Sequence, residues 1–573
     1  MRVAGRGRPV PFSLFPEILR AFWHRLMTPL RVMRRRNWFY RRLLKGKLPD
    51  HVVFYPYDAL PRRLEDADAM LKGRFRFASE TVDITGKCVF DLPAPSGRWK
   101  KGLDEFVWLP ALSLAGGDAA RDLAKDLIAQ WIARNTRYSE PAMLPQTIAR
   151  RLANIFAHGR FVLSNSDMLW RSRMFVSLRE QAKLLMRIGI EAPDGLPRLE
   201  VAAVQALAGA CLEDSPKRLA QGLQRLEEEL ARQILPDGGH ITRSPEALAH
   251  AYRHLVMVMD AMQAIDQDVP HPIRSAHDRI APMLRFFRHG DGALALFNGG
   301  CESDARMIAA LLARDEVRGQ PFAHAPHSGY QRMAAARTLA IMDCGKPPEG
   351  IHANGAHAGA LSFEFSHGPH RVVVNCGAAG SRNPRWDTAM RATAAHSTVT
   401  MNDTSYAGVI NEGFARDLIG PRLVGEPFAV ETSRRETPQG AIVEARHEGY
   451  VRDFGVAHER TLSLSPNGLS LSGVDRLVPK GNIRRPREGV PFAARFHVHP
   501  DVRVSPSQGG GILLKLPNGD GWRFRCGGAQ ISIEESVYLG TDMVRKAEQI
   551  VLLGAMRNEP VEIGWMFEQI NLA

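Results

Sequence analysis

The sequence predicts a protein of two domains, an all-helical domain followed by an antiparallel β-sandwich. From about residue 104 to 320, apolar residues recur with the 3.6-residue period of helices that bury one face. After about residue 325, short alternating runs rich in β-branched residues are separated by Gly, Asn and Pro turns. We therefore expect a leader over residues 1–50, a helical domain over 51–322 and a β domain over 323–573.

Length and composition agree with this division. The 573 residues are 45% hydrophobic and 24% charged, which is ordinary for a globular protein large enough to hold several domains. No uninterrupted apolar stretch reaches the roughly 18–20 residues that a membrane-spanning helix needs. The six cysteines are scattered without a CxxC pair, so we expect buried free thiols in a reducing compartment.

The leader carries most of the net charge of +14. Residues 1–50 hold thirteen Lys and Arg against Glu17 and Asp50, a net of +11, which leaves +3 for the other 523 residues. The body of the protein is therefore nearly neutral, and no nucleic-acid recognition module follows the basic segment. We expect no nucleic-acid partner.

The pattern within the leader is that of an amphipathic helix. One apolar stripe consists of Phe15, Ile18, Leu19, Phe22, Trp23 and Leu26. A basic helix with a Trp and Phe face can lie in the interface of an anionic membrane, which we predict for residues 1–45. Packing on the main body, or on a partner protein, is the alternative.

The leader also bears on location. It has no compact apolar core of the usual length and no clear small-residue cleavage site, so it does not resemble a secretory signal. We expect a protein of the cytoplasm or of the cytoplasmic face of the inner membrane, with the periplasm as the alternative.

The helical region shows clear starts and buried faces. Asp118 opens a segment in which Leu127 and Trp131 share one face. Ser244-Pro245 is an N-cap followed by proline at the first helical position. Several such helices joined by short loops imply a domain in which each helix covers its neighbours.

Two hairpins are the strongest signals in the β region. The runs Thr461–Ser465 and Leu469–Ser472 flank Pro-Asn-Gly. Likewise, Ile512–Leu516 and Trp522–Cys526 flank a turn that contains Asn-Gly. Closely spaced short strands of this kind favour a sandwich of antiparallel sheets.

Three short stretches of the β region, Ala356–Phe365, Val372–Gly377 and Ala394–Val399, form a set. Together they resemble the C-terminal domain of the heparinase II/III-like polysaccharide lyases, whose matching segments are His-Ala-Asp-Ala-Leu-Ser-Phe-Glu-Leu, Leu-Val-Asp-Pro-Gly and Ala-His-Asn-Thr-Val. In the helical half, Gln233–Pro245 resembles the family's Gln-Ile-Leu-Asp-Gly-Gly-His segment, with fainter matches at Phe106–Leu109 and Arg150–Asn154. The resemblance implies an incomplete (α/α) toroid joined to the sandwich, and an acidic polysaccharide in the cleft between them.

The resemblance also implies a structural zinc held by His, Asp and His. The matching positions in this sequence are His357, Asn375 and His396. Neutral imidazole suits zinc, whereas the amide of Asn375 carries no charge where the family has a carboxylate.

A uronate lyase must neutralise the carboxylate, remove the C5 proton and protonate the leaving oxygen. The family supplies these groups from Asn or His in the toroid, and from Tyr and His. At the matching positions this sequence has Gly355, Leu196, Pro197 and Ala247. As substitutes we predict His240, Arg243 and Tyr406, with His352 as a stand-in for the missing histidine.

Two functions follow from the resemblance. The first is an enzyme that cleaves an acidic, uronate-containing glycan by β-elimination. The second is a catalytically inactive member that keeps the fold and binds an envelope glycan or a partner protein.

Overall fold

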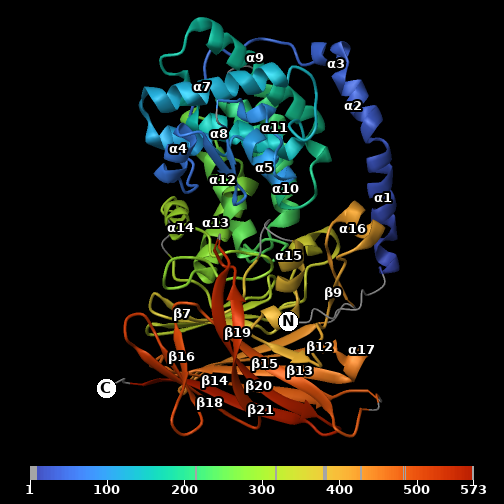
Figure 1. Ribbon diagram of the computed structural model, residues 1–573, viewed down its shortest axis with the longest axis vertical. Coiled ribbons are helices and arrows are strands. Elements are labelled where there is room, and N and C mark those ends of the chain that lie inside the picture. Colours follow the sequence, from blue (N-terminus) through green and yellow to red (C-terminus); the bar gives the residue numbers. More distant parts are fainter. Residues whose placement is uncertain are drawn as a thin grey trace.

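The computed structural model describes residues 10–570 except 85, 213–215, 316–318, 379–383, 426–428, 482, 484 and 542. Helices form one end of the molecule and β-sheets the other, and a line of helices runs along one side (Figure 1). The first nine residues of the predicted leader and the last three of the predicted β domain lie outside the described residues. The order of a helical region followed by antiparallel sheets is confirmed.

The described part of the leader forms the α-helices along the side of the molecule. They are α1 (Phe15–Leu26), α2 (Thr28–Arg36) and α3 (Trp38–Arg42). Leu14, Ile18 and Ala21 pack against α16 (Gly413–Ile419) of the β region, and the bidentate ion pair of Glu17 with Arg422 fixes the contact. The leader thus packs on the main body, which was the alternative to a free membrane helix.

In the described part of the chain, the helical domain holds α4 to α14, and its core is a cluster of buried apolar side chains. The helices are α4 (Leu64–Leu71), α5 (Gly97–Asp104), α6 (Leu109–Ala115), α7 (Gly117–Arg134), α8 (Pro145–Leu163), α9 (Met168–Ile188), α10 (Leu196–Cys211), α11 (Pro216–Gln233), α12 (Pro245–Ala264), α13 (His271–Phe287) and α14 (Ala305–Leu312). None of the helices in the described part of the chain is long and apolar enough to cross a membrane.

Local signals explain where these helices begin. The Ser244 hydroxyl accepts a hydrogen bond from the Ala247 N–H, and Pro245 starts α12, so the predicted cap is confirmed. In α7, Leu127 and Trp131 are buried on one face as predicted. A small hairpin of β1 (Arg74–Phe77) and β2 (Glu80–Asp83) interrupts the helices.

The β domain consists of two large antiparallel sheets, and their buried aromatic and aliphatic side chains form a second core. The sheet nearer the helices contains β19 (Gln530–Tyr538), β20 (Arg545–Met556), β15 (Val490–Val498), β7 (His370–Val374), β6 (Phe363–His367), β5 (Thr338–Asp343), β4 (Tyr330–Ala335) and β3 (His324–Ala325), with β8 (Val399–Met401) paired to β15. The other contains β11 (Val430–Thr437), β12 (Gly440–Tyr450), β13 (Val456–Leu464), β14 (Ser470–Pro479), β21 (Val561–Ile570), β18 (Gly521–Gly527), β17 (Ile512–Lys515) and β16 (Arg503–Pro506). Short elements complete the domain: β9 (Gly408–Val409), β10 (Leu423–Val424), α15 (Pro384–Met390) and α17 (Val451–Phe454).

Both predicted hairpins are confirmed. Strands β13 and β14 pair in antiparallel register, with Leu464 opposite Leu471, and β17 pairs with β18. The chain passes from α14 of the helical domain, which ends at Leu312, to the first strand of the large sheets at His324. The domain boundary predicted at 322/323 falls in this connection.

Candidate functional site

The histidines of two predicted signatures meet in the β domain. His357 Nδ1 and His396 Nε2 lie 3.1 Å apart, and His396 Nδ1 lies 2.9 Å from the Ala392 carbonyl. If His396 Nδ1 donates to that carbonyl, its Nε2 accepts from His357 Nδ1–H. Burial lowers the pKa of His396 to about 4 and that of His357 well below its usual value, so both rings are neutral near neutral pH.

The side-chain amide of the third predicted zinc ligand, Asn375, is engaged in other hydrogen bonds. Asn375 Oδ1 accepts from the Ser397 N–H at 3.0 Å, and Nδ2 donates to the Leu296 carbonyl at 3.2 Å and to Glu364 at 3.3 Å. Among the residues that the structure describes, no group of three His, Cys, Asp or Glu side chains is arranged to hold a metal ion. The donors therefore do not fit the family's zinc site, and zinc binding stays a prediction from the resemblance.

His240 lies in the interior, between α11 and α12. Its Nδ1 accepts from the Thr242 hydroxyl at 2.7 Å, and its Nε2 lies 3.0 Å from Gln233 Oε1. Gln233 in turn donates to the Gly195 carbonyl at 2.9 Å. Burial lowers the pKa of His240 to about 3, so the ring is neutral, and both of its nitrogens already have partners within the protein.

The Arg243 guanidinium is committed to the junction between the helical and β domains. It forms an ion pair with Asp343, and it lies over the Tyr330 ring with 4.7 Å between its central carbon and the ring centre. Its remaining N–H groups donate to backbone carbonyls of Ser328, Gly329, Gly345 and Lys346. Since all three nitrogens are engaged and the residue is buried, Arg243 has no donor directed at solvent for a sugar carboxylate.

Tyr406 is likewise buried, and its hydroxyl accepts from the Ala360 N–H at 3.1 Å. Burial raises the pKa of this phenol, which disfavours its ionised form. The three predicted catalytic side chains thus all bind other parts of the protein, and their catalytic roles stay predictions.

His352 has a different environment. It lies on the 3₁₀ turn Gly350–Gly355, close to Gly195 at the start of α10, where the resemblance places catalytic residues of the toroid. Its Nδ1 is buried and has no hydrogen-bond partner among the described residues. Burial lowers the pKa of His352, so this ring is neutral near neutral pH.

The helical domain also has a basic groove that was not predicted from the sequence. The groove has a volume of about 760 Å³ and lies among α4, the β1–β2 hairpin, α5, α6 and the start of α8. Its lining includes seven basic residues, Arg62, Arg63, Arg74, Arg76, Arg98, Lys101 and Arg150, and three acidic ones, Glu65, Asp66 and Glu105. Both faint toroid signatures, near 106–109 and 150–154, contribute to its wall.

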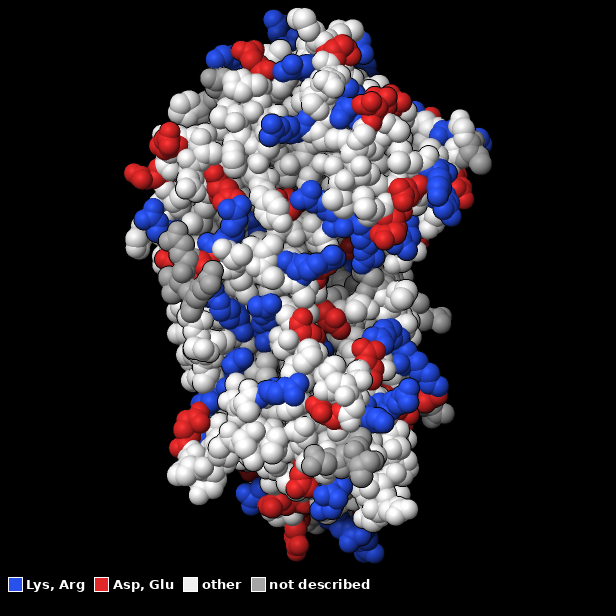
Figure 2. All heavy atoms as spheres, turned by 90° about the vertical axis from the view of Figure 1, so that its left-hand side faces the viewer, with Lys and Arg blue, Asp and Glu red and all other residues white. Residues whose placement is uncertain are grey.

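Part of the charge in the groove is neutralised internally. Glu105 lies 3.6 Å from both Lys101 and Arg150, and Arg76 pairs with Asp66 at 3.3 Å. In contrast, the exposed Arg63, Arg74 and Arg98 have no ion pair with any residue in the described ranges. Helix α4 borders the groove on the left of Figure 1, and Figure 2 shows Lys and Arg side chains, with Asp and Glu among them, across the helical half of that side.

Comparisons with known proteins give the class to which this fold belongs. A crystal structure of heparinase III matches with a TM-score of 0.70 and 14% identity, over 89% of this chain and 85% of that one. A heparan sulfate lyase of Pedobacter heparinus matches with a TM-score of 0.58 and 16% identity, over 93% of this chain and 87% of that one. At these identities the likeness defines the fold alone, which is the polysaccharide-lyase architecture of an α toroid with a β-sandwich.

Sequence comparisons define the family more narrowly. Residues 317–566 match the heparinase II/III-like C-terminal family. The "FtsZ-localized protein C" of Caulobacter vibrioides is 31% identical, over 96% of this chain and 97% of its own length. The chain belongs to the heparinase II/III-like family.

Proposed function

We propose that this protein binds an acidic polysaccharide in the basic groove of its helical domain and does not cleave it. The observation that carries the proposal is a groove of about 760 Å³ with exposed arginines that form no ion pair with the residues that the structure describes. The burial and hydrogen bonding of His240, Arg243 and Tyr406 support binding without elimination. Cleavage by β-elimination, which the family resemblance implies, is the competing proposal.

The chemistry of the groove suits a sulfated or uronate-containing chain. Guanidinium groups bind carboxylate and sulfate oxygens through paired, charge-assisted hydrogen bonds. The heparan sulfate lyase among the structural relatives acts on a glycan of this kind, which supports the same substrate class here. Because Arg63, Arg74 and Arg98 are exposed, binding should weaken steeply as salt screens their charges.

Calorimetric titration with heparan sulfate and with polyuronates tests this proposal. We expect the triple variant Arg63→Gln/Arg74→Gln/Arg98→Gln to bind at least tenfold more weakly, since about 1.4 kcal/mol is a factor of ten. The matched control, Arg171→Gln/Arg187→Gln/Arg274→Gln, removes three exposed arginines of the helical domain outside the groove and should bind normally. An equal loss of glycan affinity in the two triple variants, or no binding of the parent protein to any acidic glycan, would refute the groove assignment.

The same incubations decide between binding and cleavage. β-Elimination leaves an unsaturated uronate that absorbs in the ultraviolet, so the absorbance is followed with time. We expect no increase. A sustained increase that the Arg63→Gln/Arg74→Gln/Arg98→Gln variant abolishes would establish the lyase instead.

We also propose that the outer face of the leader attaches the protein to an anionic membrane. Although Ile18 packs inward, Phe15, Leu19 and Trp23 remain more than half exposed, at 59%, 57% and 51%. Arginines flank this apolar face along α1 and α2. An amphipathic helix of this composition lies in the headgroup region and depends on anionic lipid.

Vesicle sedimentation tests the membrane proposal. Leu19→Glu/Trp23→Glu should abolish binding to anionic vesicles. The control Met168→Glu/Leu169→Glu changes two exposed apolar residues of α9, and it should bind normally. Undiminished binding of the leader variant would exclude this face.

The relative from Caulobacter vibrioides is named for its localization with FtsZ. We propose the same localization for this chain, at the cytoplasmic face of the inner membrane. A fluorescent fusion imaged together with labelled FtsZ tests this, and a signal that does not overlap with FtsZ would refute it.

A further inference from the structure

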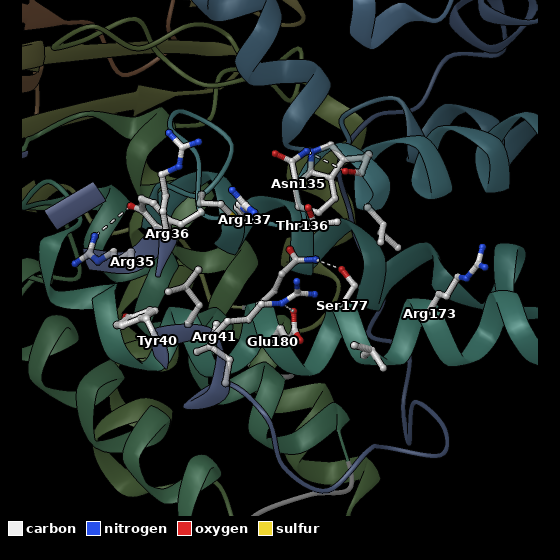
Figure 3. Close-up of a pocket in the computed structure, with 18 of the residues that line it drawn as sticks. Arg35, Arg36, Tyr40, Arg41, Asn135, Thr136, Arg137, Arg173, Ser177 and Glu180 are labelled. Atoms are coloured by element: carbon white, nitrogen blue, oxygen red, sulfur yellow. Dashed lines mark hydrogen bonds and ion pairs between the residues drawn. The ribbon is translucent and has the colours of Figure 1, made fainter. Parts of the chain in front are cut away.

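A second cavity lies between the leader and the helical domain. Residues of α2 and α3 form one side, and the α7–α8 connection and α9 form the other (Figure 3). Its volume is about 280 Å³, just below the usual range for small-molecule sites, roughly 300–1,000 Å³. Neither the glycan groove nor the outer face of the leader includes these residues.

The wall of this cavity is mainly apolar. It includes Leu44 from the leader and Trp131, Ile132, Met143, Val176 and Leu184 from the helical domain. Apolar surface of this kind stabilises a bound hydrocarbon group by removing it from water.

The rim, in contrast, is strongly basic. Five arginines, Arg35, Arg36, Arg41, Arg137 and Arg173, line the cavity together with a single acid, Glu180. Arg41 Nε lies 3.8 Å from Glu180, which partly neutralises both. The exposed Arg36, Arg137 and Arg173 have no ion pair with residues of the described ranges. Figure 3 shows Arg36 and Arg137 at the same edge of the cavity, and Arg173 further along α9.

Arg35 fixes the leader side of the cavity. Its guanidinium is buried, forms an ion pair with Glu191 and donates to the Tyr138 hydroxyl at 3.1 Å. Its Nε–H is buried as well and has no hydrogen-bond partner among the described residues. The ion pair and the hydrogen bond of Arg35 therefore hold α2 against the helical domain at the cavity.

We propose that this cavity binds a small anionic amphiphile with one hydrocarbon chain. The chain lies against the apolar wall, and a phosphate or carboxylate head lies at the edge formed by Arg36 and Arg137. A volume of 280 Å³ corresponds to on the order of nine waters at about 30 Å³ each, and so to a chain of about eight carbons. This site is independent of the glycan groove, because the two share no lining residue.

Calorimetric titration of the full-length protein with octyl phosphate, kept below its micelle concentration, tests the proposal. Inorganic phosphate supplies the head alone and 1-octanol the chain alone. We expect octyl phosphate to bind at least tenfold more tightly than either. If inorganic phosphate binds as tightly as octyl phosphate, the cavity binds free anions only. If 1-octanol binds as tightly, the arginines have no role in binding. Either result overturns the proposal, and so does the absence of octyl phosphate binding.

Two double variants locate the binding. Arg36→Gln/Arg137→Gln removes the proposed head contacts and should weaken octyl phosphate binding about tenfold or more, because hydrogen bonds to charged groups contribute more than neutral ones. Arg34→Gln/Arg171→Gln makes the same change in charge at exposed residues outside the cavity and should bind like the parent. Val176→Trp fills the cavity from α9, and it should abolish binding of octyl phosphate while leaving glycan titrations unchanged. Binding retained in Val176→Trp would overturn the assignment to this cavity.

Discussion

The ion pair between Glu17 and Arg422 should control how firmly the leader is docked. Arg422 is buried, with 1% of its side chain exposed, whereas Glu17 is 28% exposed. The pair is bidentate, at 2.5 and 2.7 Å, and Arg422 Nε also donates to Asn354 Oδ1 at 3.0 Å. The substitution Glu17→Gln keeps the shape of the side chain and leaves the buried guanidinium without its counter-charge.

Removing one partner of a fully buried pair costs about 3–5 kcal/mol. Because Glu17 is partly exposed, solvent screening reduces this, and we expect about 2 kcal/mol. The cost falls on docking of α1, whose apolar contact with α16 is small and centres on Leu14 and Ile18. At 1.4 kcal/mol for each factor of ten, the undocked leader should become about 30-fold more populated.

Hydrogen–deuterium exchange followed by mass spectrometry measures this population. The protection factors of the α1 amides should fall about 30-fold in Glu17→Gln. Those of the α7 amides should stay unchanged, since local opening need not involve the helical core. Glu412→Gln, an exposed carboxylate at the start of α16 with no side-chain cap bond, serves as the control. Unchanged protection of α1, or an equal loss in α7, would refute the reasoning.

Three further predictions concern stability. Burial lowers the pKa of His240 and of His497 to about 3 and of His254 to about 4, whereas unfolded histidine titrates near 6.5, so the unfolded chain takes up protons first as pH falls. Between about pH 7 and pH 5.5 the three histidines should together lower the free energy of unfolding by on the order of 4 kcal/mol. Urea unfolding across that range measures this loss, and a pH-independent free energy of unfolding would be the contrary result. Asp475→Asn should cost about 3–5 kcal/mol, because it removes the counter-charge of the buried Arg460, and a loss below about 1 kcal/mol in the same assay would contradict this. Treatment with a chelator should leave the melting temperature unchanged, because the side chains near the two paired histidines do not complete a metal site; a fall of several degrees would reveal a bound metal.

Much of the fold was predictable because its signals are local. The cap at Ser244 and the Asn-Gly turns before β14 and β18 depend on residues only a few positions apart, and the structure confirms them. The β1–β2 hairpin was not predicted, since four-residue strands such as Arg74–Phe77 give too short an alternation to stand out from the helical period around them. Docking of the leader depends on the surface of α16, some 400 residues later, and on Arg422.

The candidate site was predictable only in part, for a related reason. His357 and His396, which come from two of the three short signatures, lie in contact. However, the orientation of the Asn375 amide is set by Leu296 and Ser397, which neither its own signature nor the resemblance specifies. The sequence shows only that residue 243 is an arginine. Its structural role depends on burial against backbone carbonyls about 85 to 103 residues away, which no local pattern predicts.

The leader contacts both domains, and it carries the proposed membrane-binding face and one wall of the proposed amphiphile cavity. At one end Glu17 binds Arg422 of the β domain, and at the other Arg35 binds Glu191 of the helical domain, so the leader restrains motion of one domain relative to the other. A membrane would hold the outer face of α1, and an amphiphile would fill the cavity beside α2 and α3, so the two would act on different helices of the same leader. A ligand can shift docking only by as much as its affinities for the docked and undocked leader differ. Since α2 and α3 supply one wall of the cavity, an amphiphile bound there favours the docked leader, and the exchange protection lost in Glu17→Gln should return when octyl phosphate is added.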